Sequence, residues 1–320
     1  MFPLPQQDYT VMVVTLTYNH APYIEDTLKG ILMQQTDFPI VACVLDDCST
    51  DGTADIVRKY EAQYPDIIKG FYFEENQFSQ GKFTFEVLIP WLSKVKYIAL
   101  CEGDDFWTDP LKLQKQVDFM EAHPDCTMCF HSVNEHWEDG SAPDKIFFPV
   151  ENRIYTGTEI FKQWVVATSS VMIRSNIFHS QQIMDIFNNK GLMYYDHAIY
   201  MYCSVVGKAM GMSDVMGVYR RLKTGYSIIL DKNLKQCFDV IDRYCTHLQT
   251  MENIFGQGLG SEFQNIVQSR FVSKALDGCL LSIRHKQLRQ AKHFLCMSYK
   301  RAHKETIVSF VKKLARLVVK

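Results

Sequence analysis

The feature that most constrains the fold is a regular alternation of short apolar runs and helical patterns between residues 9 and 134. The runs YTVMVVTL, IVACVL, IIKGFYF and KYIAL are short and mostly apolar, several of them rich in β-branched residues, as buried strands are. Between them, apolar residues recur at helical spacing in segments such as TYNHAPYIEDTLKGILMQQ and FTFEVLIPWL. Strands that alternate with helices predict an α/β protein with a mostly parallel sheet flanked by helices.

The remainder of the chain predicts a second region of different character. A polar connection over residues 135–165 leads to a short helix and to a strand at TSSVMI. From about residue 230 the pattern is almost continuously helical, with an interruption near GQGLGS. We therefore expect a first domain over residues 1–230 and a helical C-terminal region over residues 231–320.

Composition excludes several classes of protein. The chain has 320 residues, of which 47% are apolar, and a net charge of −2, which allows a large core and argues against nucleic acid as a partner. Its ten cysteines are scattered, which predicts reduced thiols in a cytoplasmic protein, and the close pair Cys126-x-x-Cys129 is better explained as part of a strand than as a metal site. The N-terminus does not resemble a signal peptide, and no uncharged apolar run approaches about 18 residues, so we expect no membrane span.

Polar clusters follow the ends of four predicted strands. They comprise Thr15, Tyr18 and Asn19; Asp46 and Asp47; Glu75 and Asn76; and Glu102, Asp104 and Asp105. In parallel sheets, ligands bind where loops converge at the carboxyl ends of the strands. The four clusters therefore predict one ligand site along one edge of the sheet, rather than four separate solvated loops.

The stretch LCEGDDFWTDP places three carboxylates, Glu102, Asp104 and Asp105, directly after an apolar strand. A carboxylate at the end of a buried strand needs a partner, because an unpaired charge there is costly. A hard divalent cation, which prefers oxygen ligands, is the natural candidate. The alternative is that these acids cap the helix that begins near Pro110, a role that suits Asp109 better.

Four segments together resemble glycosyltransferase family 2, whose members have the GT-A fold: VVTLTYNHAPYIEDTLKGILMQ, VLDDCSTDGTADIV, EENQFSQGK and YIALCEGDDFWTDPLKLQKQVDFM. The resemblance covers about residues 9–227 and implies a Rossmann-like sheet with a nucleotide-sugar half over residues 9–134 and an acceptor half over residues 135–230. It implies an inverting enzyme that moves a sugar from a nucleotide-diphosphate sugar, expected to be UDP-linked, to a hydroxyl of a glycan or lipid-linked acceptor. The expected setting is cell-surface polysaccharide synthesis, with Mn²⁺ or Mg²⁺ as cofactor.

The resemblance also implies roles for residues of the nucleotide-sugar half. Thr15, Tyr18 and Asp46 are expected to hold the nucleoside, and Asp47 to shape its pocket. Lys82 falls where the family often has a basic residue near the base, although an exposed lysine at a helix start explains it equally well.

The EGDD segment resembles the Asp-x-Asp metal motif of the family, with Glu102 in place of the first acid. By this resemblance Asp105 is the expected direct metal ligand, and Asp104 is expected to contact the ribose or the metal. A metal held there would neutralise charge on the departing nucleotide diphosphate.

Two further roles follow from the resemblance in the acceptor half. Asp196, in GLMYYDHAIYMYCSVVG, is the expected general base for the acceptor hydroxyl, with Tyr195 in place of a preceding acid; the alternative is a helix-capping aspartate. The segment GVYRRLKTGYS (Gly217–Ser227) resembles a loop that closes over the diphosphate, with Arg220 as a phosphate contact; an exposed basic loop explains the segment equally well. Relatives often have a metal-binding histidine in this loop, and this sequence has none.

Two other functions remain open: a catalytically silent carbohydrate-binding or scaffold protein of the same fold, and a sugar-phosphate nucleotidyltransferase. The second would require a glycine-rich basic loop after the first strand, which TLTYNHAP lacks.

From Lys300 to Lys320 there are seven Lys or Arg residues and one acid, with apolar and basic residues on different helical faces. This tail predicts either peripheral contact with the inner membrane face or a helix packed against its own domain.

Overall fold

The computed structural model describes residues 7–82, 84–222, 234–302, 308–309 and 313. The chain divides into two compact units: the first comprises Met1–Asn188 and Ile199–Leu222, and the second comprises Asn189–Ala198 and Lys223–Lys320. In the part of the chain that is described, no helix is both long enough and apolar enough to cross a membrane.

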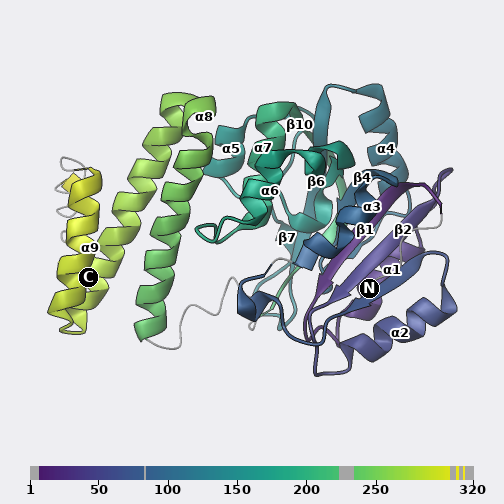
Figure 1. Cartoon of the computed structure of the whole chain (residues 1–320), viewed down its shortest axis with the longest axis horizontal. Helices are drawn as coiled ribbons and strands as arrows, with labels where there is room; N and C mark the ends of the chain where they lie inside the picture. The colour runs from purple at the N-terminus through teal and green to yellow at the C-terminus, as the bar shows by residue number, and fades with distance from the viewer. Residues whose placement is uncertain (1–6, 83, 223–233, 303–307, 310–312, 314–320) are drawn as a thin grey trace. The chain divides into compact units, whose positions relative to one another are not determined.

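The first unit is built around one sheet of ten described strands (Figure 1). These are β1 (Tyr9–Thr17), β2 (Ile40–Asp46), β3 (Ile68–Tyr72), β4 (Val95–Leu100), β5 (Phe106–Trp107), β6 (Cys126–Trp137), β7 (Lys145–Ile146), β8 (Ile154–Tyr155), β9 (Met172–Arg174) and β10 (Lys208–Arg221). The strand order is β3-β2-β1-β4-β9-β6-β10-β5, with β7 paired to β6 and β8 to β10.

The predicted α/β architecture is confirmed, with one refinement in the direction of the strands. Strands β3, β2, β1 and β4 are parallel neighbours, as the alternation of strands and helices predicts. Beyond them β9 is antiparallel to both β4 and β6, while β6 and β10 run parallel. The sheet is therefore parallel on the side of the first strands and mixed on the other side.

The helices of the first unit are α1 (Ile24–Leu32), α2 (Thr53–Gln63), α3 (Ile89–Leu92), α4 (Lys112–Ala122), α5 (Gly157–Lys162) and α6 (Gln181–Phe187); α7 (Tyr195–Val206) begins in the second unit and ends in the first. Helix α1 buries Ile24, Leu28 and Ile31 in the core under the sheet. The predicted helix at FTFEVLIPWL is shorter than expected: a 3₁₀ turn over Thr84–Leu88 precedes the four-residue α3.

A close approach between α1 and β5 fixes the edge of the sheet where the acidic stretch lies. At Gly30 of α1, an added Cβ atom would stand 2.9 Å from the backbone nitrogen of Trp107, closer than real side chains allow. Glycine at this position therefore lets the helix pack directly on β5, the strand that follows the acidic loop.

The second unit is helical, as the sequence predicts. Helix α8 (Leu234–Arg284) breaks at Gly260, where φ is 73° and ψ is −166°, and α9 (Leu288–Arg301) follows. Figure 1 shows the two arms of α8 and α9 packed side by side. The break lies within the predicted interruption at GQGLGS, and glycine accounts for it because a positive φ carries little steric cost there.

One prediction about backbone structure is wrong. Gly217–Arg221, expected to be the start of a loop that closes over the diphosphate, forms the end of β10 and pairs in parallel with β6. The rest of that predicted loop, residues 223–227, lies outside the described residues, as does most of the basic tail over residues 300–320.

Candidate functional site

The acidic loop, which we define as residues 101–105, lies against the end of β1. The backbone N–H groups of Cys101 and Gly103 donate to the carbonyl oxygens of Val14 (3.1 Å) and Leu16 (2.9 Å). At Gly103 an added Cβ would lie 2.6 Å from the hydroxyl oxygen of Thr17, so only glycine allows this contact. The loop is thus held rigidly at the carboxyl ends of the central strands, where ligands bind in sheets of this kind.

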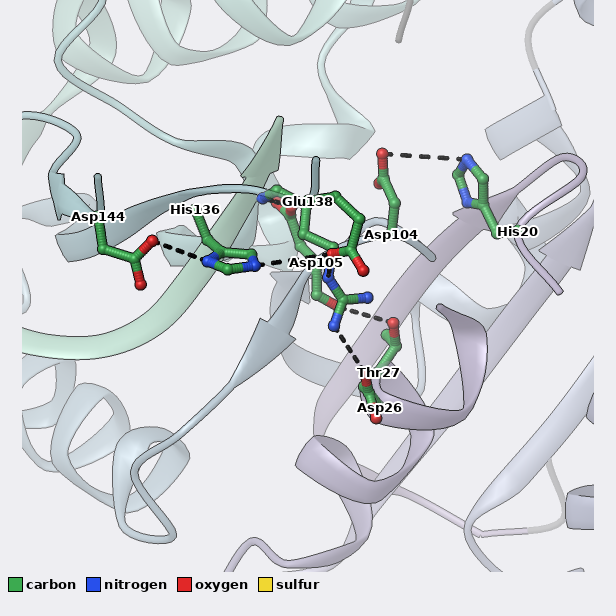
Figure 2. A network of polar contacts seen from close by, with 9 residues as sticks. His20, Asp26, Thr27, Asp104, Asp105, His136, Glu138 and Asp144 are labelled. Carbon is green, nitrogen blue, oxygen red and sulfur yellow. Dashed lines mark hydrogen bonds and ion pairs between the residues drawn. The ribbon is translucent and has the colours of Figure 1, made fainter. Parts of the chain in front are cut away.

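The two adjacent aspartates of the acidic loop have opposite surroundings (Figure 2). Asp105 is fully buried: its Oδ1 accepts a hydrogen bond from the Arg220 N–H (2.8 Å), and its carbonyl oxygen accepts one from the Thr27 hydroxyl (2.6 Å). The Asp104 side chain is 21% exposed, and its Oδ2 lies 4.0 Å from Nε2 of His20. Asp104 is therefore the aspartate of the pair that a ligand can reach.

Burial raises the pKa of the Asp105 carboxyl well above its usual range, and the neighbouring Asp104 charge raises it further. The Arg220 N–H, the nearby Ser169 hydroxyl and the Arg220 charge act in the opposite direction. Oδ2 of Asp105 is buried and receives no hydrogen bond from the described residues. These surroundings fit a residue that anchors the loop to β10.

The acidic loop also bears on metal binding. Among the described residues, no group of three or more His, Cys, Asp or Glu side chains is arranged to hold a metal ion. Mg²⁺ and Mn²⁺ do not require such a cage when they bind through a substrate, because one or two carboxylates and the phosphate oxygens can suffice. Asp104 and Glu102, both partly buried, are two carboxylates that could bind such an ion together with phosphate oxygens.

Thr15 and Asp46, both predicted to hold the nucleoside, lie near the ends of the neighbouring strands β1 and β2. The hydroxyl oxygen of Thr15 and Oδ1 of Asp46 are buried and have no hydrogen-bond partner among the described residues. Oδ2 of Asp46 accepts from the Ser49 N–H (3.1 Å), which fixes the carboxylate in position. Buried polar atoms without partners are costly in a folded chain, and two on neighbouring strands suit a site whose ligand supplies the missing bonds.

Asp47 is engaged by its own chain. Its two carboxylate oxygens accept hydrogen bonds from the N–H groups of Gln77 (2.6 Å) and Phe78 (3.0 Å). Its carbonyl oxygen accepts from the side-chain amide of Asn76 (3.0 Å). Asp47 therefore holds the turn that follows β3, an arrangement that would shape a pocket rather than contact a ligand.

Two other predicted contacts of the nucleotide lie on the surface. The ring of Tyr18 is 46% exposed just beyond β1, where it is free to stack on a base. Lys82 is exposed after the turn held by Asp47, and its backbone N–H donates to the carbonyl oxygen of Gln77 (3.0 Å). The role of Lys82 stays a prediction.

Arg220 is the centre of a polar network that the sequence did not reveal. Its guanidinium is almost completely buried, donates to Oδ2 of Asp26 in α1 (2.6 Å) and forms an ion pair with Glu138, Nε to Oε2, at 3.2 Å. It also lies over the rings of Tyr23 and Phe106, with 5.1 Å and 4.8 Å to the ring centres. Its Nε and Nη1 are buried and have no hydrogen-bond partner among the described residues, and its predicted contact with the donor stays a prediction.

The network continues outward from Glu138 through His136. Nε2 of His136 lies 3.8 Å from Oε2 of Glu138, and its Nδ1 lies 2.8 Å from Oδ1 of Asp144 (Figure 2). The network thus ties α1, the end of β10 and the β6–β7 connection to the acidic loop. Asp26 and Glu138 were missed because nothing in their local sequence marks Arg220, far along the chain, as their partner. Asp144 joins the network only through His136, eight residues before it.

Asp196, the predicted general base, lies in the first turn of α7 and belongs to the second unit. The neighbouring His197 is buried, which fits a structural histidine. The role of Asp196 stays a prediction.

Comparison with known proteins identifies relatives of the chain. The sequence model described as "Glycosyl transferase family 2" matches residues 12–180. The uncharacterized protein Rv1520 of Mycobacterium tuberculosis is 34% identical over 209 residues, which are 65% of this chain and 58% of that protein. The putative teichuronic acid biosynthesis glycosyltransferase TuaG of Bacillus subtilis is 29% identical over 220 residues, 68% of this chain and 81% of that protein. The chain thus spans 58% of the length of its mycobacterial relatives.

Solved structures share the fold at low sequence identity. The structure of S. aureus TarS 1–349 with UDP-GlcNAc has a TM-score of 0.56 at 16% identity, over 91% of each chain. The mannosyltransferase PcManGT from Pyrobaculum calidifontis, with GDP-Man and Mn²⁺, has a TM-score of 0.52 at 17% identity, over 99% of this chain and 83% of that one. The similarity confirms the GT-A type of fold. Because the family's sequence model also covers more than half of the residues, the chain belongs to glycosyl transferase family 2.

Proposed function

We propose that the chain is an inverting glycosyltransferase that moves a sugar from a nucleotide-diphosphate sugar to a hydroxyl group of a glycan or lipid-linked acceptor. The observation that carries the proposal is the pair of buried oxygens on Thr15 and Asp46 that lack partners among the described residues, at the sheet edge where the acidic loop lies. A nucleoside bound there would supply the missing hydrogen bonds, and its diphosphate would extend toward Asp104.

Relatives support the nature of the donor and of the product. The TarS structure contains UDP-GlcNAc, and the PcManGT structure contains GDP-Man, so nucleotide sugars bind to proteins of this fold. Between a UDP-linked and a GDP-linked sugar, we propose a UDP-linked sugar as the donor. The name of TuaG, a putative teichuronic acid biosynthesis glycosyltransferase, supports a role in polysaccharide synthesis. We place this role at a cell-surface polysaccharide, with the enzyme in the cytoplasm.

A divalent cation fits the residues at this edge. Asp104, with Glu102 beside it, would hold Mn²⁺ or Mg²⁺, and the ion would stabilise negative charge on the departing nucleotide diphosphate. Asp105, first expected to be the direct ligand, is better suited to hold the loop in place, because it is buried and bonded to Arg220. The Mn²⁺ in the PcManGT complex supports this choice of cofactor.

The acceptor requires a base, because a neutral sugar hydroxyl is a poor nucleophile. In the proposed reaction the Asp196 carboxylate accepts the proton of the acceptor hydroxyl as the hydroxyl oxygen attacks the anomeric carbon. The nucleotide diphosphate leaves from the opposite face, so one displacement inverts the configuration of that carbon. Tyr18 would stack on the base of the donor while the acceptor reacts.

Ligand-induced thermal stabilisation tests the proposal. Nucleotide sugars are screened with and without Mn²⁺, and a UDP-linked sugar at 100 times its Kd should stabilise the chain by about 2.7 kcal/mol. Asp46→Asn should lose most of this ligand-induced shift, whereas the control Asp55→Asn, at an exposed site on α2, should keep it. A chain that no nucleotide sugar stabilises would favour the silent scaffold. Stabilisation by a nucleoside triphosphate with a sugar phosphate would favour a nucleotidyltransferase.

The basic tail over residues 300–320 remains a second proposed contact, with the inner membrane face. It is tested by cosedimentation of the full chain, and of a chain that ends at Tyr299, with anionic liposomes. Equal binding by the two chains would count against a role for the tail.

A further inference from the structure

The end of the second unit carries an unbroken run of positive charge. Between Gly278 and Lys304 there are seven Lys or Arg residues and three His residues, and there is no Asp or Glu, although the whole chain has a net charge of −2. The described part of this run comprises the end of α8, the turn after it and α9. A run of this kind produces a local positive potential that the net charge of the chain conceals.

The basic turn, which we define as residues 283–292, has a fixed backbone. The Lys286 N–H donates to the carbonyl oxygen of Ile283 (3.0 Å), and the Gln287 N–H donates to that of Ser282 (2.8 Å). These two bonds form a Schellman motif, with Lys286 at a φ of 58° in the left-handed position that glycine usually occupies. The side chains around it are therefore presented by a defined turn between two helices.

The basic turn exposes aliphatic and basic side chains together. Leu288 is 74% exposed and Ile283 is 47% exposed, which is unusual for large aliphatic residues in so short a segment. The basic side chains around them are also exposed: Arg284, His285, Lys286, Arg289 and Lys292.

None of these five basic residues forms an ion pair with a carboxylate in the described residues. Three of the five acids in α8 have other partners: Asp242 pairs with His293, Glu252 with Arg301 and Asp277 with Lys313. The positive charge of the basic turn is therefore not neutralised by these acids.

We propose that the basic turn docks on an anionic membrane surface, with Leu288 and Ile283 entering the headgroup region and the basic side chains beside the lipid phosphates. Aliphatic residues flanked by Lys and Arg match the requirements of an interfacial contact, which gains from both burial and charge. A nucleic acid would engage the basic residues and leave Leu288 in water. This surface is separate from the tail over residues 300–320, and the inference does not depend on the proposed sugar transfer.

Cosedimentation of the full chain with vesicles tests the inference. Vesicles of phosphatidylcholine with phosphatidylglycerol should bind the chain, and vesicles of phosphatidylcholine alone should not. Lys286→Gln/Arg289→Gln/Lys292→Gln should weaken binding about a hundredfold, because each basic residue near such a surface contributes about fivefold. Leu288→Ser should weaken it about tenfold, through the lost burial of one aliphatic side chain.

A matched control removes three exposed charges elsewhere. Lys29→Gln/Lys59→Gln/Lys190→Gln has the same net charge as the triple variant of the basic turn and should bind vesicles as the unmodified chain does. The inference is overturned if the two triple variants bind equally, if binding persists in high salt, or if the chain binds duplex DNA but not the anionic vesicles. The thermal shift with a nucleotide sugar is measured on every variant and should stay unchanged, which separates this inference from the proposed function.

Discussion

Replacing Lys112 with methionine should stabilise the first unit, and by more at pH 6 than at pH 9. Lys112 begins α4 and is fully buried beneath the sheet edge that carries the acidic loop. Its ammonium nitrogen lies 3.7 Å from the centre of the Trp107 ring and has no hydrogen-bond partner among the described residues. Burial lowers the pKa of Lys112 from 10.5 to about 7.

The direction of the pH effect follows from proton binding. Between pH 7 and 10.5 the unfolded chain holds a proton on Lys112 that the folded chain has lost, so stability rises with pH in this range. A difference of one in pKa corresponds to about 1.4 kcal/mol, so burying Lys112 costs about 5 kcal/mol near pH 6 and about 2 kcal/mol near pH 9. The gain from Lys112→Met should therefore be smaller at pH 9 by about 2–3 kcal/mol.

The groups that face Lys112 do not titrate in this range. Burial raises the pKa of the Cys129 thiol to about 12 and that of the Cys101 thiol well above its usual value. Burial lowers the pKa of His131 to about 3. A change in the effect of Lys112→Met between pH 6 and pH 9 therefore reports on Lys112 itself.

Urea unfolding followed by tryptophan fluorescence measures the effect. All four tryptophans of the chain, at positions 91, 107, 137 and 164, belong to the first unit, so the signal reports on that unit. Lys59→Met, at an exposed site on α2, is the control and should show no comparable dependence on pH. A Lys112→Met variant that is less stable than the parent at both pH values, or equally stabilised at both, would refute the reasoning.

Three further predictions concern the acidic loop, the base and the Arg220 network. Asp104→Asn should lower turnover by orders of magnitude in the presence of Mn²⁺ and leave the midpoint of urea unfolding unchanged. Asp105→Ala should instead lower the free energy of unfolding by about 1–3 kcal/mol, because the Arg220 N–H loses its acceptor. Asp196→Asn should abolish transfer in a product assay and keep the donor-induced thermal shift; a lost shift would place Asp196 in the donor site. Arg220→Met should lower the free energy of unfolding in urea by about 1–2 kcal/mol, which is less than for a fully buried ion pair because Asp26 and Glu138 are partly exposed. The variant should keep the donor-induced thermal shift if Arg220 only holds β10 against α1.

The sequence predicted the parallel half of the sheet better than the mixed half. Strands β1 and β2 are mostly apolar runs because both of their faces are largely buried, and such runs are visible without a structure. Strand β10 was missed because its register shifts between Met212 and Val215, where the polar residues Ser213 and Asp214 interrupt the pattern. A bulge of this kind breaks the period of two that identifies a strand.

The position of the site could be predicted, since polar residues at strand ends in a parallel sheet share one edge. The partners of those residues could not. Asp26 and Arg220 are 194 residues apart in sequence, and Asp105 accepts from a backbone N–H 115 residues away. A backbone donor has no sequence signature, because every residue except proline carries one.

Two pairs of adjacent aspartates, Asp46–Asp47 and Asp104–Asp105, show why a functional residue is difficult to choose when its hydrogen-bond donors are not visible in the sequence. In each pair the chain itself engages one acid: the Arg220 N–H bonds to Asp105, and the N–H groups of the turn after β3 bond to Asp47. Asp46 also accepts one hydrogen bond, from the Ser49 N–H, and its Oδ1, like Oδ2 of Asp105, is buried without a hydrogen bond from the described residues. The Asp104 side chain is instead 21% exposed. Donors elsewhere in the chain decide how each acid is held, and no local sequence pattern reveals them. Our proposal of Asp104 rather than Asp105 as the metal ligand rests on exposure, because Asp105 is buried and Asp104 is partly exposed.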